Sequence, residues 1–262
     1  MTFGSLFAGI GGIDRGLELA GMECQWQVEI DPFCTKVLAK HWPDVRRYED
    51  VRKVGRANLA SVDLIAGGFP CQDISPAGRN RHVKKGTSGN KSGLWFEYAR
   101  VIEELRPTWA VIENTPQLLK TNGGNDFRSI IRFLGKCGYV GWWRVLDAQY
   151  FGVATKRRRL FVVAYSGTER FRFLLSESNQ ELLALPPKQA GRNNLPRICG
   201  WGGGLSLERL GQCVLTKTDS DRNGTGYGIS RRMDGRRWNA LGNAVVPQCA
   251  EWIGRRIMDA QS

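Results

Sequence analysis

The stretch Thr2-Phe-Gly-Ser-Leu-Phe-Ala-Gly-Ile-Gly-Gly12 decides the fold. Residues 2–7 have the apolar character of a short strand, and residues 13–21 have the spacing of an amphipathic helix. Glycines between them let the backbone approach a ligand closely, and the start of the helix offers free N–H groups. The order strand, glycine-rich turn, helix therefore predicts a nucleotide-binding α/β unit, although the spacing is not the dinucleotide pattern G-x-G-x-x-G.

The alternation of strands and helices continues to about residue 165. Further strands are predicted at 26–30, 62–66, 109–112, 141–146 and 160–164, and further helices at 32–41, 95–105 and 126–137. Such alternation indicates an α/β fold with a doubly wound, mostly parallel sheet. We predict a main domain over 1–166, a small irregular region over 167–236 and a returning C-terminal helix within 237–262. Apolar residues recur every fourth position through that helix, at about 239–258.

Composition narrows the function classes. The 262 residues carry a net charge of +13, which is typical of a protein with a polyanionic partner. The seven cysteines include no Cys-x-x-Cys pair and there are two histidines, so no metal site is predicted. No signal peptide and no apolar run of membrane-spanning length are recognisable. We therefore expect a protein of the reducing cytoplasm with no membrane segment.

Two acidic residues follow the early strands. Glu29 lies about 20 residues beyond the glycine turn, where a carboxylate can accept hydrogen bonds from both hydroxyls of a ribose. Asp50 follows Tyr48-Glu49, at the end of a short strand between 26–30 and 62–66, and is placed to meet an adenine amino group. A glycine turn alone is often only a tight connection, but the turn with both carboxylates predicts an adenosine-containing cofactor.

Cys71 is the candidate nucleophile. It lies in Gly67-Gly-Phe-Pro-Cys-Gln-Asp-Ile-Ser75, which follows a buried strand and so reaches the carboxyl edge of the sheet. Most free cysteines are small core residues. Polar neighbours and the basic stretch 79–92 would instead favour a thiolate here. We interpret 79–92 as a mobile loop that closes over a polyanionic substrate; an ordinary solvated loop is the alternative.

Two more groups complete the candidate site. Glu113 ends an apolar strand, where a carboxyl group could protonate or hydrogen-bond a base ring. The basic run Thr155-Lys-Arg-Arg-Arg-Leu-Phe161 leads into a later strand. Strand alternation would put Arg157 and Arg159 on one face and Arg158 on the other. Two guanidinium groups could therefore serve the same site as Glu113.

Five motifs resemble, in the same order, those of DNA cytosine-5 methyltransferases. They are Phe7-Ala-Gly-Ile-Gly-Gly12, Pro70-Cys-Gln72, Glu113-Asn114, the Arg157/Arg159 pair and Leu241-Gly-Asn-Ala-Val245. The combination is highly specific and spans the chain apart from about 167–235. The resemblance implies a Rossmann-like class I methyltransferase fold, S-adenosylmethionine as cofactor without a metal, and double-stranded DNA as substrate. It also implies a monomer that works in the cytoplasm at the nucleoid, in bacterial or phage restriction-modification.

The resemblance further implies a role for each motif residue. The cofactor pocket would consist of Phe7, Ala8, Gly9, Ile10, Gly11, Gly12, Glu29, Ile30, Asp50, Val51, Pro70, Asn243 and Val245. Cys71 would attack C6 of a cytosine flipped out of the duplex. Glu113 would contact N3 and the exocyclic amine, Arg159 would hold the carbonyl, and Arg157 would steady the neighbouring loop and phosphate. Substrate contacts would come from Gln72, Ser75, Arg79 and Arg81.

The chain departs from the family pattern in three places. Thr115 stands where Val is usual, and Thr155 stands where Gln is usual. The segment that organises target recognition has only a faint echo in Leu205-Ser-Leu-Glu-Arg-Leu-Gly211. The recognition region is therefore short, and no target sequence can be read from it.

Three alternatives stay open. A nucleotide-dependent oxidoreductase explains the glycine turn and Glu29, but not Cys71 with its partners. A cytosine-5 methyltransferase of RNA, such as tRNA, is compatible with the short recognition region. A catalytically inactive DNA-binding relative is compatible with that region as well, but the intact Cys71, Glu113 and Arg159 argue against it.

Overall fold

The structure is a computed structural model that describes residues 1–70, 93–167 and 240–261. Its strands are β1 (Thr2–Leu6), β2 (Glu23–Val28), β3 (Arg46–Tyr48), β4 (Leu64–Gly67), β5 (Trp109–Asn114), β6 (Val140–Asp147) and β7 (Arg158–Tyr165). Its α-helices are α1 (Gly12–Leu19), α2 (Pro32–His41), α3 (Leu94–Leu105), α4 (Asn125–Lys136) and α9 (Pro247–Gln261). Short 3-10 helices are η1 (Val51–Lys53), η4 (Pro116–Leu119), η5 (Thr121–Gly124) and η6 (Ala148–Phe151).

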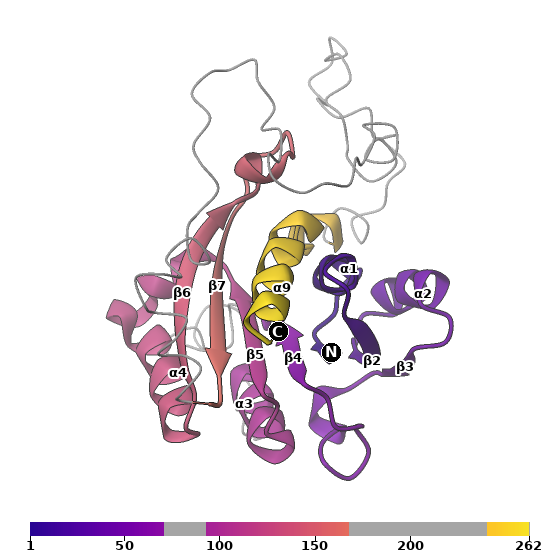
Figure 1. The fold of residues 1–262 in the computed structure, drawn as a ribbon, viewed down its shortest axis with the longest axis horizontal. Helices are drawn as coiled ribbons and strands as arrows, with labels where there is room; N and C mark the ends of the chain where they lie inside the picture. The colour runs from indigo at the N-terminus through magenta and orange to yellow at the C-terminus, as the bar shows by residue number, and fades with distance from the viewer. Residues whose placement is uncertain (71–92, 168–239, 262) are drawn as a thin grey trace, which may run out of the picture.

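The strands form one seven-stranded sheet in the order β3-β2-β1-β4-β5-β7-β6 (Figure 1). Strands β1 to β5 pair in parallel, and this confirms the predicted α/β class with a mostly parallel sheet. Strand β7 runs antiparallel to both β5 and β6. Because β7 is reversed, its first residues lie at the carboxyl edge of the parallel strands, with Leu160 opposite Asn114.

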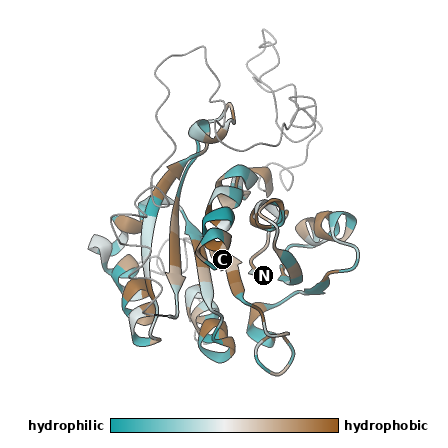
Figure 2. Cartoon of the chain, viewed as in Figure 1, coloured by the Kyte–Doolittle hydropathy of each residue, from teal (hydrophilic) through white to brown (hydrophobic). Residues whose placement is uncertain are grey.

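Both faces of the sheet are covered, as expected for parallel strands. One core contains Ile65, Ile112 and Tyr98, the last from α3. The other contains Phe3, Leu17 from α1 and Ile253 from α9. In Figure 2 the helices carry both hydrophobic and hydrophilic residues, which suits elements with one buried side. Among the helices of the described residues, none is long and apolar enough to span a membrane.

A buried polar cluster joins α1 to the first two strands. Asp14 accepts hydrogen bonds from Ser5 Oγ at 3.0 Å and from Gln27 Nε2 at 2.8 Å. Burial raises the pKa of Asp14 to about 6. The cluster fixes the first turn of α1, which follows the glycine turn, against β1 and β2.

The C-terminal segment differs from the predicted continuous helix over 239–258. The structure has a helical turn at 240–243, then a break, and α9 begins only at Pro247. A proline suits the first turn of a helix but disfavours helical backbone at the preceding residue, so the interruption falls before it. The predicted small region 167–236 lies outside the described residues except for Gly167.

Helix α9 lies beside α1, so the end of the chain supports its beginning (Figure 1). Gly16 of α1 faces α9 so closely that a Cβ there would collide with the Pro247 carbonyl oxygen and lie 2.5 Å from the Ala250 Cβ. Arg255 of α9 donates to the Leu19 carbonyl oxygen at 3.2 Å. The two helices therefore pack nearly backbone to backbone.

We expect Gly16→Ala to destabilise the protein by about 1–3 kcal/mol, because backbone atoms would have to move apart. Gly135→Ala in α4 is the matched control, since a Cβ at this helical position meets nothing within 4 Å. That control should be neutral, or stabilising by up to about 1 kcal/mol. Urea unfolding of both variants measures the difference, and equal stabilities would contradict the close packing of α1 and α9.

Candidate active site

The predicted site residues gather at one edge of the sheet. The glycine turn follows β1, Glu29 follows β2 and Asp50 follows β3, while Glu113 is the last residue but one of β5. Carboxyl ends of parallel strands meet at the same edge, where α/β folds bind ligands. The reversed β7 delivers Arg159 to this edge as well.

The glycine turn lies between β1 and α1 and has left-handed backbone at several residues. Gly9 and Gly11 have φ of 57° and 83°, a backbone conformation that glycine adopts without strain, and Phe7 shares it at 55°. The amide of Ala8 donates to the Val28 carbonyl oxygen at 3.1 Å. The turn is thus tied to the end of β2 before α1 begins.

Glu29 is oriented by backbone groups on both sides. Its Oε2 accepts the Gly9 amide at 2.7 Å and its Oε1 accepts the Asp31 amide at 2.8 Å. Next to it, Ile30 leaves 66% of its surface exposed, which is unusual for a large apolar side chain. An aligned carboxylate beside an exposed apolar side chain fits a nucleoside, with the sugar on the carboxylate and the base on the isoleucine.

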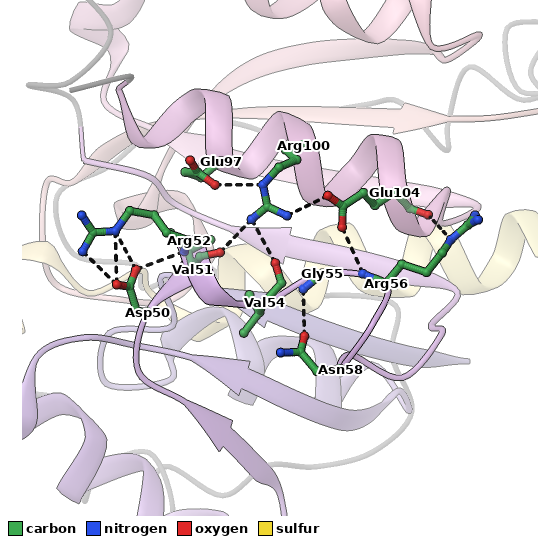
Figure 3. Close-up of polar contacts among 10 residues, drawn as sticks. All are labelled: Asp50, Val51, Arg52, Val54, Gly55, Arg56, Asn58, Glu97, Arg100 and Glu104. Carbon is green, nitrogen blue, oxygen red and sulfur yellow. Dashed lines mark hydrogen bonds and ion pairs between the residues drawn. The ribbon is translucent and has the colours of Figure 1, made fainter. Parts of the chain in front are cut away.

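Asp50 caps η1 and is held by a neighbour. Its Oδ1 accepts the Arg52 amide at 3.0 Å, and the Arg52 side chain pairs with both carboxylate oxygens (Figure 3). The hydrogen bond from the Arg52 side chain lowers the pKa of Asp50. Val51, the other predicted contact in this turn, is buried in the core.

Glu113 is the buried acid of the site. Its Oε1 pairs with Arg159 Nε at 2.9 Å, and a Cβ on Gly68 would collide with its Oε2. Burial raises the pKa of Glu113 to about 7, although the charges of Arg159 and Arg157 act to lower it. Near neutral pH this carboxyl group can therefore hold or release a proton.

The arginine run behaves as alternation predicted. Arg157 and Arg159 are partly buried and Arg158 is exposed. Burial lowers the pKa of Arg157, and the neighbouring charge of Arg159 lowers it further. Among the described residues, Nε and Nη2 of Arg157 have no hydrogen-bond partner although both are buried.

The C-terminal motif reaches the same edge. Arg159 Nη2 lies 3.5 Å from the Gly242 carbonyl oxygen, which connects the turn at 240–243 to β7. Asn243 is exposed. Val245 packs its side chain into the core, and its carbonyl oxygen lies so close to Gly12 that a Cβ there would collide with it. Of the two, Val245 therefore contacts the end of the glycine turn, and Asn243 is exposed.

The described part of the loop after β4 stops one residue before the candidate nucleophile. Pro70 is exposed, and the preceding Phe69 carbonyl oxygen accepts a hydrogen bond from Asn114 Nδ2 at 3.0 Å. Five predicted residues, together with the basic stretch 79–92, lie outside the described residues: Cys71, Gln72, Ser75, Arg79 and Arg81. Within the described residues, no group of three or more His, Cys, Asp or Glu could hold a metal ion.

Sequence reasoning assigned no role to two supporting residues. Trp42 covers the glycine turn, since a Cβ on Gly11 would collide with its ring, and its Nε1 donates to Glu18 Oε1 at 2.5 Å. Asn114 fixes the loop that leads to Cys71. The Glu113-Asn114 motif could have indicated a role for Asn114. The residues next to Trp42 in the chain do not indicate that its ring will cover the glycine turn.

The fold is Rossmann-like and resembles the folds of solved methyltransferases. The solved structure of the Entamoeba histolytica methyltransferase EhMeth has a similar fold, with a TM-score of 0.63 and 15% identity over 100% of this chain and 99% of that one. A putative DNA modification methyltransferase from an Escherichia coli prophage gives a TM-score of 0.52 and 23% identity over 63% of this chain and 46% of that one. The chain belongs to the C-5 cytosine-specific DNA methylase family, whose sequence profile matches residues 1–198.

Two proteins similar in sequence come from bacteria. The Type II methyltransferase M2.BsuMI of Bacillus subtilis (strain 168) is 38% identical over 97% of this chain and 74% of that protein. The Type II methyltransferase M.MspI of Moraxella sp is 34% identical over 62% of this chain. The chain spans only 38% of the length of the Moraxella protein.

Proposed function

We propose that this protein transfers a methyl group from S-adenosylmethionine to C5 of a flipped-out cytosine in DNA, through a covalent bond between Cys71 and C6. One observation carries the proposal: the ion pair of buried Glu113 and partly buried Arg159 lies at the carboxyl edge, beside the loop that leads into Cys71. Family membership agrees with it. The Type II names of the bacterial relatives support the same reaction class and a restriction-modification setting.

The edge of β1, β2 and β3 would hold the cofactor. The glycine turn would lie along its amino-acid part, Glu29 would accept the ribose hydroxyls, and Ile30 would lie against the adenine. Asp50 would accept a hydrogen bond from the adenine amino group. For this it would use a carboxylate lone pair that Arg52 does not occupy. Pro70 and Asn243 would close the pocket at its two ends. When bound, S-adenosylmethionine supplies an electrophilic methyl group on a sulfonium.

The protein side chains would perform the ring chemistry. The Cys71 thiolate would add to C6, and protonated Glu113 would donate to N3, so that electron density moves to C5. After C5 accepts the methyl group, Glu113 would take the N3 proton back and solvent would accept the C5 proton. Elimination of the thiolate would then restore the ring and Cys71. A carboxyl group with a pKa of about 7 suits this role, because it gives up its proton near working pH.

Arg159 would have two tasks. It would hold the cytosine carbonyl with one part of its guanidinium while its Nε keeps Glu113 in place at 2.9 Å. Arg157 would steady the neighbouring loop and a phosphate, and its unpartnered buried donors suit an anionic ligand. Gln72, Ser75, Arg79 and Arg81 would contact the substrate.

The proposal also covers the setting of the reaction. The net charge of +13 favours a polyanionic substrate. We propose that the protein acts as a monomer in the bacterial cytoplasm, at the nucleoid. The bacterial source of its Type II relatives supports the bacterial setting.

Transfer of a tritiated methyl group tests the substrate. We expect label in duplex DNA and not in tRNA, with binding that weakens steeply as salt rises, because several phosphates are neutralised. Bisulfite sequencing of DNA from cells that express the protein would then identify the methylated cytosines. Label in tRNA alone would establish the RNA alternative, and label in neither would favour an inactive relative.

A further inference from the structure

The side chain of Arg100, on α3, reaches across to the turn that follows β3 (Figure 3). Its Nη2 donates to the carbonyl oxygens of Val51 and Val54, both at 2.9 Å. These two carbonyl groups belong to η1 and to the residue just after it, and Asp50 is the N-terminal cap of η1. Arg100 therefore joins α3 to the backbone next to a candidate cofactor residue.

Two carboxylates of the same helix hold the guanidinium in this orientation. Arg100 Nε pairs with Glu97 at 2.9 Å, and Nη1 pairs with Glu104 at 2.8 Å. The arginine thus uses its planar fork in three directions at once. Lysine, with a single nitrogen on a flexible stem, cannot reproduce this set of bonds.

The turn itself is fixed by further side-chain contacts. Asn58 accepts the Gly55 amide at 2.9 Å and donates to the Lys53 carbonyl oxygen at 2.8 Å. Glu104 accepts the Arg56 amide at 3.0 Å (Figure 3). In Figure 3 the hydrogen bonds that connect this turn to α3 are made by Arg100 and Glu104. Because Asp50 accepts the amide of a residue within η1, its carboxylate moves with the turn.

We propose that Arg100 is a positioning residue of the cofactor site. By holding the carbonyl groups of Val51 and Val54, it sets the place at which the Asp50 carboxylate meets the adenine amino group. Without the guanidinium, water would hydrogen-bond both carbonyl groups. The turn after β3 could then shift relative to β2 and to Glu29, which follows β2. This inference rests on the proposed function, since it takes Asp50 as the adenine partner.

Calorimetric titration with two nucleosides tests the inference. S-adenosylhomocysteine has the adenine amino group, and S-inosylhomocysteine lacks it. We expect Arg100→Met to weaken binding of the first about 10-fold, the usual effect of losing a charged hydrogen bond, and to weaken binding of the second much less. Arg100→Lys should fall between wild type and Arg100→Met. With saturating cofactor, kcat should stay close to wild type while KM for S-adenosylmethionine rises.

Arg106→Met is the matched control. Arg106 caps the same helix and donates to the Cys137 carbonyl oxygen at 2.9 Å, away from the cofactor turn. The Arg106→Met substitution should leave the binding of both nucleosides unchanged. Equal losses for the two nucleosides in Arg100→Met, or a loss as large in Arg106→Met, would overturn the positioning role.

Hydrogen exchange of the free protein separates this inference from the proposed function. In Arg100→Met the amides of residues 51–56 should exchange faster than in wild type and in Arg106→Met, whatever the ligand. Unchanged exchange would overturn the inference even if the enzyme is confirmed. A wild-type protein that binds neither nucleoside would instead overturn the proposed function, and with it any role of the ordered turn in cofactor binding.

Discussion

Replacing Cys71 with serine is expected to reduce methyl transfer to background, a loss of about 10⁴-fold or more, as when other enzymes lose their nucleophile. A hydroxyl is far less ionised than a thiol near neutral pH, so attack on C6 would fail even with the base correctly bound. The direct measurement uses duplex DNA that contains 5-fluorocytosine, in which fluorine cannot leave as the C5 proton does. Wild type with S-adenosylmethionine should form an adduct that survives denaturing electrophoresis, and Cys71→Ser should form none.

A second cysteine variant shows whether the effect belongs to this thiol. Cys137 lies at the C-terminal end of α4, away from the carboxyl edge, and Cys137→Ser should form the adduct at the wild-type rate. Both variants should bind S-adenosylhomocysteine like wild type, which shows that they fold. An adduct that persists in Cys71→Ser would refute covalent catalysis by this residue.

Glu113→Gln is expected to reduce kcat by about 10²–10⁴-fold, the usual range for losing a general acid. Glutamine keeps the shape of the side chain, but it has no proton to transfer and loses the charge that pairs with Arg159. Glu103→Gln on the exposed side of α3 is the matched control and should retain full activity. Wild-type turnover by Glu113→Gln would exclude the proposed proton transfer.

The pH profile gives Glu113 a second signature. Because burial raises its pKa to about 7, the protonated form dominates below that pH and is lost above it. The value of kcat/KM should therefore fall as pH rises through about 7, and this fall should be absent in Glu113→Gln. The free energy of unfolding should depend on pH in the same direction. Because the pKa of Glu113 is higher in the folded state than in the unfolded chain, its contribution to stability is complete below the unfolded pKa and is lost as pH rises through the folded pKa.

Local sequence patterns predicted most of the framework. Apolar periodicity located six of the seven strands and the first four α-helices of the described residues to within about three residues, because it records which side of each element is buried. Residues after the early strands, such as Glu29 and Asp50, could be assigned to one site because parallel strands end at the same edge of a sheet. The helix predicted over 239–258 was wrong in its start, although Pro247 was a readable signal for the break.

The sequence by itself determined the α/β class, the glycine turn and the motif order that identifies the family, since these depend on residues close together in the chain. Only the tertiary structure decided the reversal of β7, the pairing of Arg159 with Glu113 and the reach of Arg100 to the turn after β3. The flanking Glu97 and Glu104 of Arg100 predict only an ordinary salt-bridged helix surface. A proton affinity such as that of Glu113 depends on how deeply a group is buried and which charges surround it, and both come from segments distant in sequence.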